Sequence, residues 1–288
     1  MPEPTRTLTA RVTDAAGLAA WRQVHRGARV GLVPTMGALH AGHDALVRKA
    51  VADCDAVVAS VFVNPLQFDE RGDFERYPRD LDRDGARLAA LGVAAIYAPE
   101  ESELYPPGFD TRVAPGAAAR TLEGACRPGH FEGVLTVVLK LLQRVRPTDA
   151  YFGEKDAQQL HLVRRMVADL DLPVRIFALP TVREADGLAL SSRNARLDAP
   201  ARERAAGLCR GLVAAAAAFD AGERDPRALQ AAAGAVLAAA GVEPEYVAVV
   251  DDRDFAPADA ARGGVWRAVV AARIGGVRLI DNRLLGPA

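Results

Sequence analysis

Short apolar runs alternate with segments of helical periodicity along the first 180 residues of this 288-residue chain. A short run that is apolar at nearly every position is typical of a strand buried on both faces of a parallel sheet. Strands that alternate with helices predict an α/β fold. The predicted strands are residues 30–33, 56–63, 93–97, 149–152 and 174–178.

The chain changes texture near residue 199, where Ala-rich helices begin. We therefore expect two domains, residues 1–182 and a smaller α/β domain of residues 183–288. In the first domain, a helix capped at Asp14 precedes the opening strand, and a short strand is expected at 111–113. The remaining predicted helices are 41–53, 80–91, 131–145, 153–170, 201–218 and 225–240, and the later strands are 245–251, 265–274 and 277–280.

Composition narrows the class of protein. Half of the residues are apolar, and 36 Lys and Arg nearly balance 37 Asp and Glu. This balance gives no indication of a nucleic-acid or membrane partner. The first residues lack the pattern of a secretory signal, and the Ala-rich stretches are too short to span a bilayer. Three widely spaced cysteines without a CxxC pair fit a reducing compartment, so we expect a cytoplasmic protein.

The turn after the opening strand carries two histidines, His40 and His43. Gly37 and Gly42 permit tight turns, and the next helix is expected to begin near Ala41. A helix N-terminus at the end of a parallel strand favours phosphate binding, although this is neither a GxGxxG fingerprint nor a P-loop. Two other interpretations remain open at this point. The i, i+3 spacing could serve a metal with further ligands, or the histidines could simply cap the helix.

Polar residues gather at three further places. Asn64 and Gln67 follow the second buried strand, where an α/β fold places ligand contacts. Lys155 and Asp156 open a later helix, with amides following on its next turn. The segment 190–194 places two hydroxyls beside a guanidinium, which suits a phosphate clamp. Taken separately, the last two segments also fit a solvated turn and a hydroxyl-capped turn.

Acidic residues begin the helix expected at 80–91. Asp80, Asp82 and Asp84 form a favourable charge pattern for a first turn, and a metal site is the alternative.

Taken together, these segments resemble the pantothenate synthetase (pantoate–β-alanine ligase) family. The resemblance covers most of the first two thirds of the chain, and the last third agrees in texture only, including residues 279–282 (LIDN). The matching stretches are 34–43 (PTMGALHAGH), 62–68 (FVNPLQF), 77–79 (YPR), 127–131 (RPGHF), 152–159 (FGEKDAQQ) and 190–194 (LSSRN).

The resemblance implies a fold, a reaction and cofactors. The family belongs to the His-x-Gly-His nucleotidyltransferase superfamily, which implies a Rossmann-like N-terminal domain and a smaller C-terminal domain. Pantoate would attack the α-phosphorus of MgATP to give pantoyl adenylate and pyrophosphate, and β-alanine would then displace AMP to form pantothenate. ATP and Mg²⁺ are the implied cofactors, and the family is typically homodimeric.

The resemblance also implies roles for individual residues. His43, as proton donor, and His40, Lys155 and Arg193 are the expected catalytic residues. Adenylyl transfer needs such cations and donors, because negative charge concentrates on the phosphates. Gln67, Gln159, Asn64 and His130 are expected to bind substrate, and Gln67 could also meet β-alanine. The expected ATP-binding residues are Met36, Gly37, His40, Gly42, His43, Gly153, Lys155, Asp156, Val182, Leu190, Ser191, Ser192 and Arg193.

Four positions depart from the family pattern. Ala41 replaces a common Glu, Asp44 stands where an apolar residue is usual, and Ala157 replaces an aromatic residue. Arg83 interrupts the acids sometimes associated with magnesium, so no protein ligand is assigned to Mg²⁺.

Two alternative functions remain. An adenylyltransferase that uses the same histidines on another small acid or a phosphorylated cofactor precursor would release no AMP. The second alternative is a regulatory module that binds a nucleotide without catalysis. Such a module would not need cationic and hydrogen-bond donors gathered together with two side-chain amides.

Overall fold

The computed structural model describes residues 9–286 of the chain. The chain divides into two compact units. Unit 1 comprises Met1–Gly153 and Leu162–Leu179, and unit 2 comprises Glu154–His161 and Pro180–Ala288. The domain boundary expected after residue 182 stays a prediction. Each unit is described by itself below.

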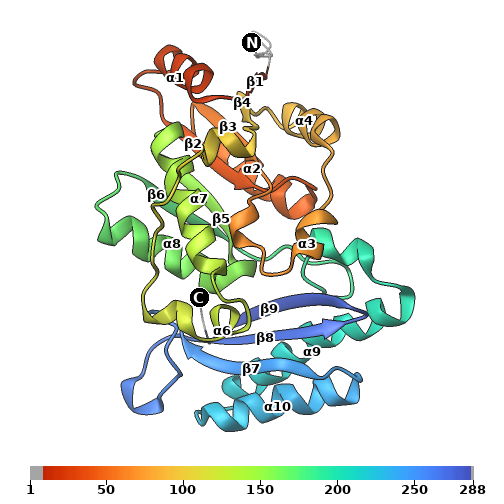
Figure 1. Ribbon diagram of the computed structural model, residues 1–288. Coiled ribbons are helices and arrows are strands. Elements are labelled where there is room, and N and C mark those ends of the chain that lie inside the picture. Colours follow the sequence, from red (N-terminus) through yellow and green to blue (C-terminus); the bar gives the residue numbers. More distant parts are fainter. Residues whose placement is uncertain (1–8, 287–288) are drawn as a thin grey trace, which may run out of the picture. The chain divides into compact units, whose positions relative to one another are not determined.

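A parallel sheet forms the centre of unit 1 (Figure 1). Within the described residues its strand order is β1-β4-β3-β2-β5-β6, and every pairing is parallel. This confirms the α/β class and all five predicted strands of this sheet. The strands are β1 (Ala10–Val12), β2 (Val30–Thr35), β3 (Ala56–Val61), β4 (Ala95–Tyr97), β5 (Asp149–Gly153) and β6 (Arg175–Leu179).

Two details of the predicted sheet were wrong. The edge strand β1 was missed, because three residues are too few to show a periodicity, and it forms by pairing with β4. The strand expected at 111–113 is absent from the described structure. The Val113 N–H donates to the Thr136 hydroxyl at 3.0 Å, so a helix side chain takes the bond that a strand partner would need.

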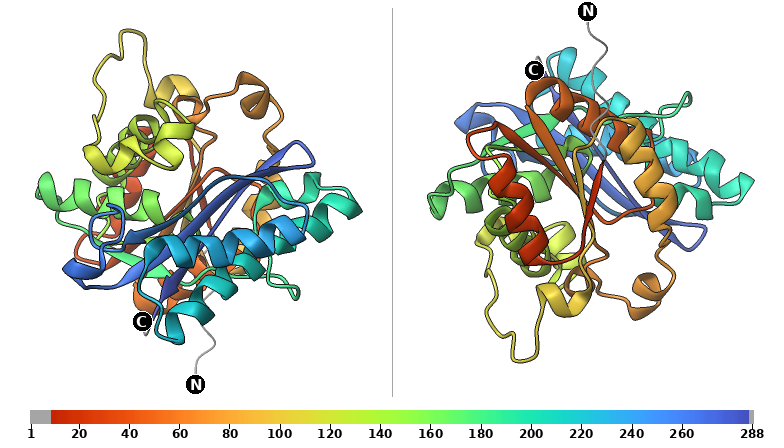
Figure 2. Two further views of the ribbon diagram at one scale, coloured as in Figure 1. Left: turned by 90° about the horizontal axis from the view of Figure 1, so that it is seen from below. Right: turned by 90° about the horizontal axis from the view of Figure 1, so that it is seen from above.

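Helices cover both faces of this sheet. Side chains of α2 and α4, such as Leu46 and Leu88, pack with Val33, Val57 and Ile96 on one face. The right-hand view of Figure 2 shows the red α1 and the golden α4 on opposite sides of the strands. The helices that begin in unit 1 are α1 (Ala15–Val24), α2 (Ala41–Asp53), α3 (Arg71–Glu75), α4 (Leu81–Ala90), α5 (Glu101–Leu104), α6 (Glu123–Cys126) and α7 (His130–Val145).

The order of the strands reverses between β2 and β5. From β2 the chain proceeds through α2 to β3 and then to β4 on one side, whereas β5 leads through α8 (Ala157–Asp169) to β6 on the other. The carboxyl ends of β2 and β5 therefore lie at a topological switch point, which is where open α/β sheets bind ligands. Thr35 and Gly153 are the last residues of these two strands.

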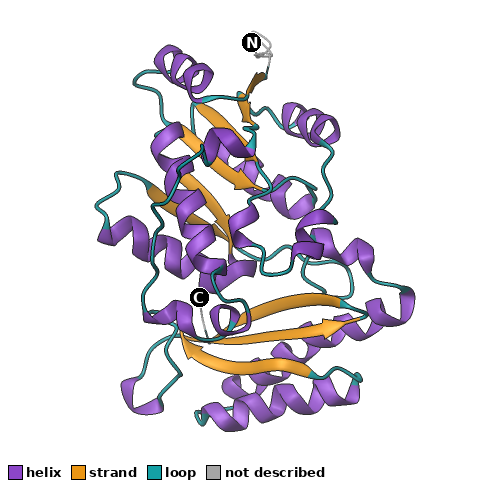
Figure 3. Cartoon of the chain, in the orientation of Figure 1, coloured by secondary structure: helices purple, strands orange, loops and turns teal. Residues whose placement is uncertain are grey.

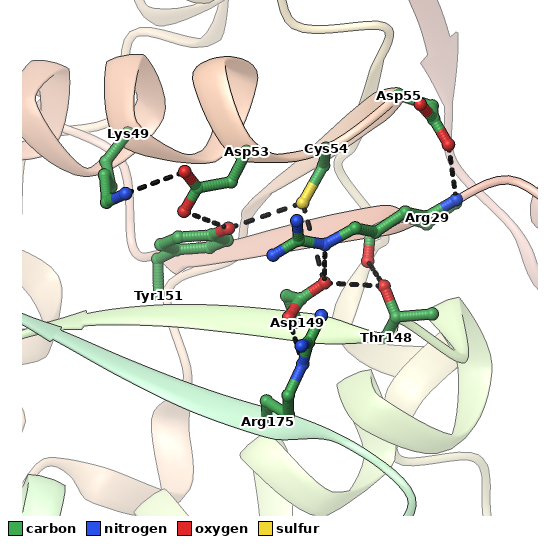
Figure 4. A network of polar contacts seen from close by, with 10 residues as sticks. Arg29, Lys49, Asp53, Cys54, Asp55, Thr148, Asp149, Tyr151 and Arg175 are labelled. Carbon is green, nitrogen blue, oxygen red and sulfur yellow. Dashed lines mark hydrogen bonds and ion pairs between the residues drawn. The ribbon is translucent and has the colours of Figure 1, made fainter.

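The opposite ends of the same strands are joined by a polar network (Figure 4). The buried Asp149 carboxylate accepts from Arg29 Nε at 2.8 Å and from the Thr148 hydroxyl at 2.7 Å, and it forms an ion pair with Arg175 Nε at 2.8 Å. The Tyr151 hydroxyl and the Cys54 thiol extend this network. Burial by itself raises the pKa of Asp149, but the three donors outweigh it and lower this pKa to about 2.

Unit 2 is built on a second sheet (Figure 3). Within the described residues its antiparallel order is β7-β8-β9, and α9 and α10 pack against it through Leu208, Leu229, Leu237 and their neighbours. The smaller α/β domain and all its predicted elements are confirmed. They are α9 (Ala199–Asp220), α10 (Pro226–Ala239), β7 (Pro244–Asp251), β8 (Trp266–Ile274) and β9 (Val277–Leu285).

Over residues 9–286, none of the helices combines the length and the apolar character that crossing a membrane requires.

Candidate active site

The two histidines form the cap of α2. His40 is the N-cap residue, and its Nδ1 accepts the Gly42 N–H at 3.2 Å. Nδ1 of His43 accepts the His40 N–H at 3.3 Å, so the two side chains make a reciprocal capping box. An Nδ1 atom that accepts carries no proton, and in a neutral imidazole the proton then sits on Nε2. In this cap each neutral ring therefore carries its proton on Nε2, and an Nε2–H group is a donor that suits an anion.

Asp84 of α4 holds the backbone of the turn before His40. Its buried carboxylate accepts the Ala38 N–H at 2.8 Å and the Leu39 N–H at 2.9 Å. The turn needs this support, because Ala38 has a φ of 52° and lies in the left-handed region. Gly37 has a φ of 82°, and a Cβ there would lie 2.9 Å from Oδ2 of Asp84. Asp84 is thus a structural part of the candidate site that the sequence pattern did not identify.

The three acids of α4 have different surroundings. Asp80 is the N-cap and accepts the Arg83 N–H, while Asp82 is exposed beside Arg11. Both carboxylate oxygens of Asp84 accept hydrogen bonds from backbone N–H groups. Across residues 9–286, no group of three or more His, Cys, Asp or Glu side chains is placed to hold a metal ion.

A second contact joins α2 to α4. Asp44 is buried, and Arg87 donates to its two oxygens at 2.6 and 2.9 Å. This hydrogen-bonded guanidinium holds the pKa of Asp44 below its ordinary value. Position 44 is usually apolar in the family, and here Arg87 of α4 compensates the charge of the buried Asp44.

Asn64 and Gln67 lie in a short turn just after β3. The Asn64 amide donates to Gln67 Oε1 at 3.0 Å and to the Gly133 carbonyl at 3.1 Å, and its oxygen accepts the Tyr105 hydroxyl at 2.8 Å. Burial raises the pKa of Tyr105, which keeps that hydroxyl protonated as a donor. Asn64 is 1% exposed, so its contacts fix the side-chain oxygen of Gln67.

His130 and Arg127 support the same turn from the start of α7. Arg127 Nη1 lies 3.2 Å from Nε2 of His130, and an arginine can only donate. Nε2 therefore accepts, and the protonated Nδ1 donates to the Gln67 carbonyl at 2.7 Å. Arg127 donates to this carbonyl as well, at 3.1 Å, and pairs with Asp69. The sequence prediction gave Tyr105 no role, and Arg127 entered it only within the matching stretch 127–131, because their contacts with Asn64, Asp69 and Gln67 cross long sequence separations.

A cavity of about 630 Å³ opens at the carboxyl edge of the sheet in unit 1. Met36, Gly37 and Asp84 line it, together with Val63 after β3 and Ala98 after β4. Met36 and Gly37 are predicted ATP residues, but His40, His43 and Gln67 are not among the lining residues, so the cavity adjoins the turn before the histidines.

Lys155, Asp156 and Gln159 are grouped in unit 2. Lys155 and Asp156 belong to the single-turn 3₁₀ helix Glu154–Asp156, and Gln159 follows in α8. The Lys155 ammonium lies 3.7 Å from the Asp156 carboxylate. Ala157, which stands in the place of a family aromatic residue, is buried.

The second candidate ATP segment of unit 2 is a backbone-paired loop. The Leu190 N–H donates to the Val182 carbonyl at 3.0 Å, which brings Val182 next to the serines. Ser191 caps the 3₁₀ helix Ser192–Arg196 through the Arg193 N–H at 3.2 Å. The hydroxyl-capped turn is therefore present in the structure, and it places Ser192 and Arg193 at a helix start.

The contacts thus gather the candidate residues into two groups in each unit. Met36, Gly37, His40, Gly42, His43 and Gly153 gather where β2 and β5 end, and Asn64, Gln67 and His130 share one turn. Lys155, Asp156 and Gln159 share one segment, and the loop from Val182 to Arg193 forms the other. The individual binding roles stay predictions.

A parallel sheet with a His-x-Gly-His helix cap at its switch point is the arrangement that the resemblance to the His-x-Gly-His nucleotidyltransferases implies. Comparison with known proteins narrows this class to one family. The chain belongs to the pantoate-beta-alanine ligase family, whose family model matches residues 9–284. Membership confirms the resemblance and the ligase class that the motifs predicted.

Individual relatives agree over nearly the whole chain. A pantothenate synthetase from Chelativorans sp. is 52% identical over 267 residues, which are 93% of either chain. A crystal structure of pantothenate synthetase from Thermus thermophilus has a TM-score of 0.91 at 46% identity and covers 97% of this chain and 100% of that one. The pantoate-beta-alanine ligase from Francisella tularensis, complexed with beta-gamma ATP and beta-alanine, has a TM-score of 0.80 at 35% identity, with coverages of 97% and 100%.

Proposed function

We propose that this chain condenses pantoate with β-alanine at the expense of ATP. The observation that carries the proposal is the His-x-Gly-His cap at the β2/β5 switch point, in a chain that matches its family over residues 9–284. The Francisella tularensis relative, complexed with beta-gamma ATP and beta-alanine, supports ATP and β-alanine as ligands.

The reaction has two steps. A pantoate carboxylate oxygen attacks the α-phosphorus of ATP, forms a P–O bond and displaces pyrophosphate. The neutral amine of β-alanine then attacks the acyl carbon of pantoyl adenylate, and the C–O bond to AMP breaks as the amine loses a proton. No nucleophilic side chain is needed, because the activated intermediate is a mixed anhydride on the substrate.

The phosphates would be bound by the side chains that the resemblance marks as catalytic. The Nε2–H groups of His40 and His43 and the cations Lys155 and Arg193 stabilise charge that grows on the α-phosphate and on pyrophosphate. His43 serves as proton donor. Hydroxyl and backbone donors complete the ATP contacts, at Met36, Gly37, Gly42, Gly153, Asp156, Val182, Leu190, Ser191 and Ser192.

Gln67 and Gln159 would bind pantoate through their amides. Asn64 and His130 are assigned to the substrate group as well. Because Asn64 holds the side-chain oxygen of Gln67 and His130 holds its backbone carbonyl, both support Gln67 in the orientation that the substrate meets.

Magnesium would arrive with ATP as part of the substrate. The described carboxylates do not offer a cage, since Asp84 is committed to the Ala38 and Leu39 amides and residues 9–286 hold no cluster of three or more candidate ligands. Mg²⁺ typically keeps several waters and binds through substrate phosphates, so this donor set fits MgATP.

We also assign the chain to the cytoplasm. We expect a homodimer, and sedimentation equilibrium tests this oligomeric state.

The deciding experiment is an AMP assay in which each substrate is omitted in turn. A pantothenate-forming ligase releases AMP only when ATP, pantoate and β-alanine are all present. An adenylyltransferase would release pyrophosphate without AMP, and a regulatory module would release neither. Either of these outcomes excludes the proposed reaction.

A further inference from the structure

Asn282 of β9 holds the turn that carries Lys155. Its Nδ2 group donates to the backbone carbonyls of Glu154 and Lys155, and both distances are 2.8 Å. A side-chain amide has two N–H donors, so these two bonds use both of them. Asn282 is 5% exposed, and the two bonds are therefore protected from competition with water.

The oxygen of the same amide is fixed from the opposite side. Asn282 Oδ1 accepts from Arg267 Nη1 at 2.6 Å, and Arg267 Nε donates to Asp252 Oδ1 at 2.6 Å. Arg267 is buried on the neighbouring strand β8. Because the planar guanidinium is held at two points, it fixes the plane of the Asn282 amide.

The preceding residue of β9 anchors the other ATP segment of unit 2. Arg183 donates to both oxygens of Asp281 at 2.7 and 2.9 Å, and also to the Gly187 carbonyl. Arg183 lies in the loop whose backbone pairs Val182 with Leu190. Consecutive residues of one strand thus secure both segments to which the proposed function assigns ATP contacts.

We propose that Asn282 is a positioning residue for Lys155 during adenylyl transfer, a role that rests on the proposed function of Lys155. The amide fixes the main chain on either side of the Lys155 Cα and so limits where the ammonium can reach. A cation that must meet growing charge on a phosphate loses its effect when it is displaced, and a shift of about 1 Å can cost about 100-fold in rate.

Two variants separate the parts of this contact. Asn282→Asp keeps the size and the oxygen that accepts from Arg267, but it presents an oxygen instead of an NH₂ group to two carbonyls. Asn282→Ala removes the whole amide. Leu285→Ala is the matched control, because it removes a core side chain three residues further along the same strand.

We expect both Asn282 variants to lower kcat for AMP release by about 30- to 100-fold, with KM for pantoate changed by less than about threefold. The Leu285→Ala control should lose melting temperature while kcat of its folded fraction stays within about threefold. If all three variants lost kcat in the same proportion to their loss of melting temperature, the proposal would be overturned.

A double-mutant cycle with Lys155→Ala tests whether Asn282 acts through Lys155. Asn282→Ala should weaken ATP binding in the native background, where Lys155 is assigned an ATP contact. In the Lys155→Ala background it should change kcat and the Kd for ATP by less than about threefold. If Asn282→Ala lowered kcat and ATP affinity by the same factors in both backgrounds, Asn282 would act independently of Lys155. That result would overturn the proposal. The Kd arm stays decisive even if the native chain releases no AMP from pantoate and β-alanine, an outcome that would instead contradict the proposed reaction.

Discussion

The carboxylate of Asp84 lies 2.8 Å from the backbone nitrogen of Ala38 and fixes a turn that its own sequence disfavours. Ala38 has a positive φ, which is costly for a residue with a side chain. The second oxygen of Asp84 binds the next N–H, at Leu39. Since His40 follows directly, this carboxylate determines where the capping histidines begin.

Replacing Asp84 with Asn should release this turn. The amide can accept only one of the two N–H groups, and its own NH₂ faces the other. We expect unfolding free energy to fall by about 1–3 kcal/mol and kcat to fall by about 10- to 100-fold. Asp82→Asn is the control, because that side chain is 92% exposed. Native kcat in Asp84→Asn, measured by AMP release, would contradict a role for this turn.

The helix-capping and chemical roles of His43 can be separated by two substitutions. Glutamine at this position keeps an acceptor for the His40 N–H, as in an ordinary capping box, whereas alanine does not. His43→Gln should therefore melt close to the native protein, and His43→Ala should lose about 0.5–2 kcal/mol. Both should lower kcat by at least about 100-fold. Near-native turnover in the Gln variant would reject His43 as proton donor.

Gln67→Ala should weaken pantoate binding more than ATP binding. We expect KM for pantoate to rise by about 10-fold or more, because an amide that meets a substrate carboxylate or hydroxyl contributes about 1.5 kcal/mol. KM for ATP should change by less than about threefold. Gln143→Ala, at an exposed position of α7, is the control. Equal increases in both KM values would show that Gln67 is not a pantoate ligand.

The Asp44–Arg87 pair should show coupling in a double-mutant cycle. Asp44→Leu alone removes the partner of Arg87, and Arg87→Met alone leaves a buried carboxylate without its main partner. We expect each to cost about 1–3 kcal/mol of unfolding free energy, with a coupling energy of about 1–2 kcal/mol because Arg87 is partly exposed. Urea denaturation measures both values, and additive costs would contradict the compensation inferred for position 44.

Asp149 should make stability depend on acid pH. Its pKa is about 2 in the folded chain and 3.8 without the fold, so its contribution is complete above pH 4 and is lost as the pH falls towards 2. The lost contribution is about 2 kcal/mol. Asp149→Asn should flatten this part of the profile while kcat of the folded protein at pH 7 changes little. An unchanged acid slope in denaturant titrations would refute this.

The parallel sheet and most elements of both units could be predicted because each depends on a local pattern. Apolar runs marked β2 and β3, and Asp14 marked the start of α1 as a side-chain cap. The edge strand β1 depends on its pairing with β4, across more than 80 residues, and carries no pattern of its own.

The donor residues of the candidate site could be predicted from the sequence, but the residues that hold them in position could not. Motif spacing pointed to His40, His43 and Lys155, because glycine-rich turns and helix starts mark ligand sites. Asp84 and Asn282 act across long sequence separations, and a lone acid or amide gives no local signal of such a contact. For the same reason Asp84 was grouped with Asp80 and Asp82, whose surroundings differ.

The bond between Asn282 and the Lys155 carbonyl spans 127 residues of sequence, and this separation has a consequence for synthesis on the ribosome. At about 5–20 residues per second, β9 is made roughly 6–25 s after the Lys155 turn. During that interval α9, α10 and β8 are synthesised, but the Lys155 turn lacks its hydrogen bonds from Asn282. A nascent chain therefore completes the sheet of unit 1 well before it can fix the lysine on which adenylyl transfer is proposed to depend.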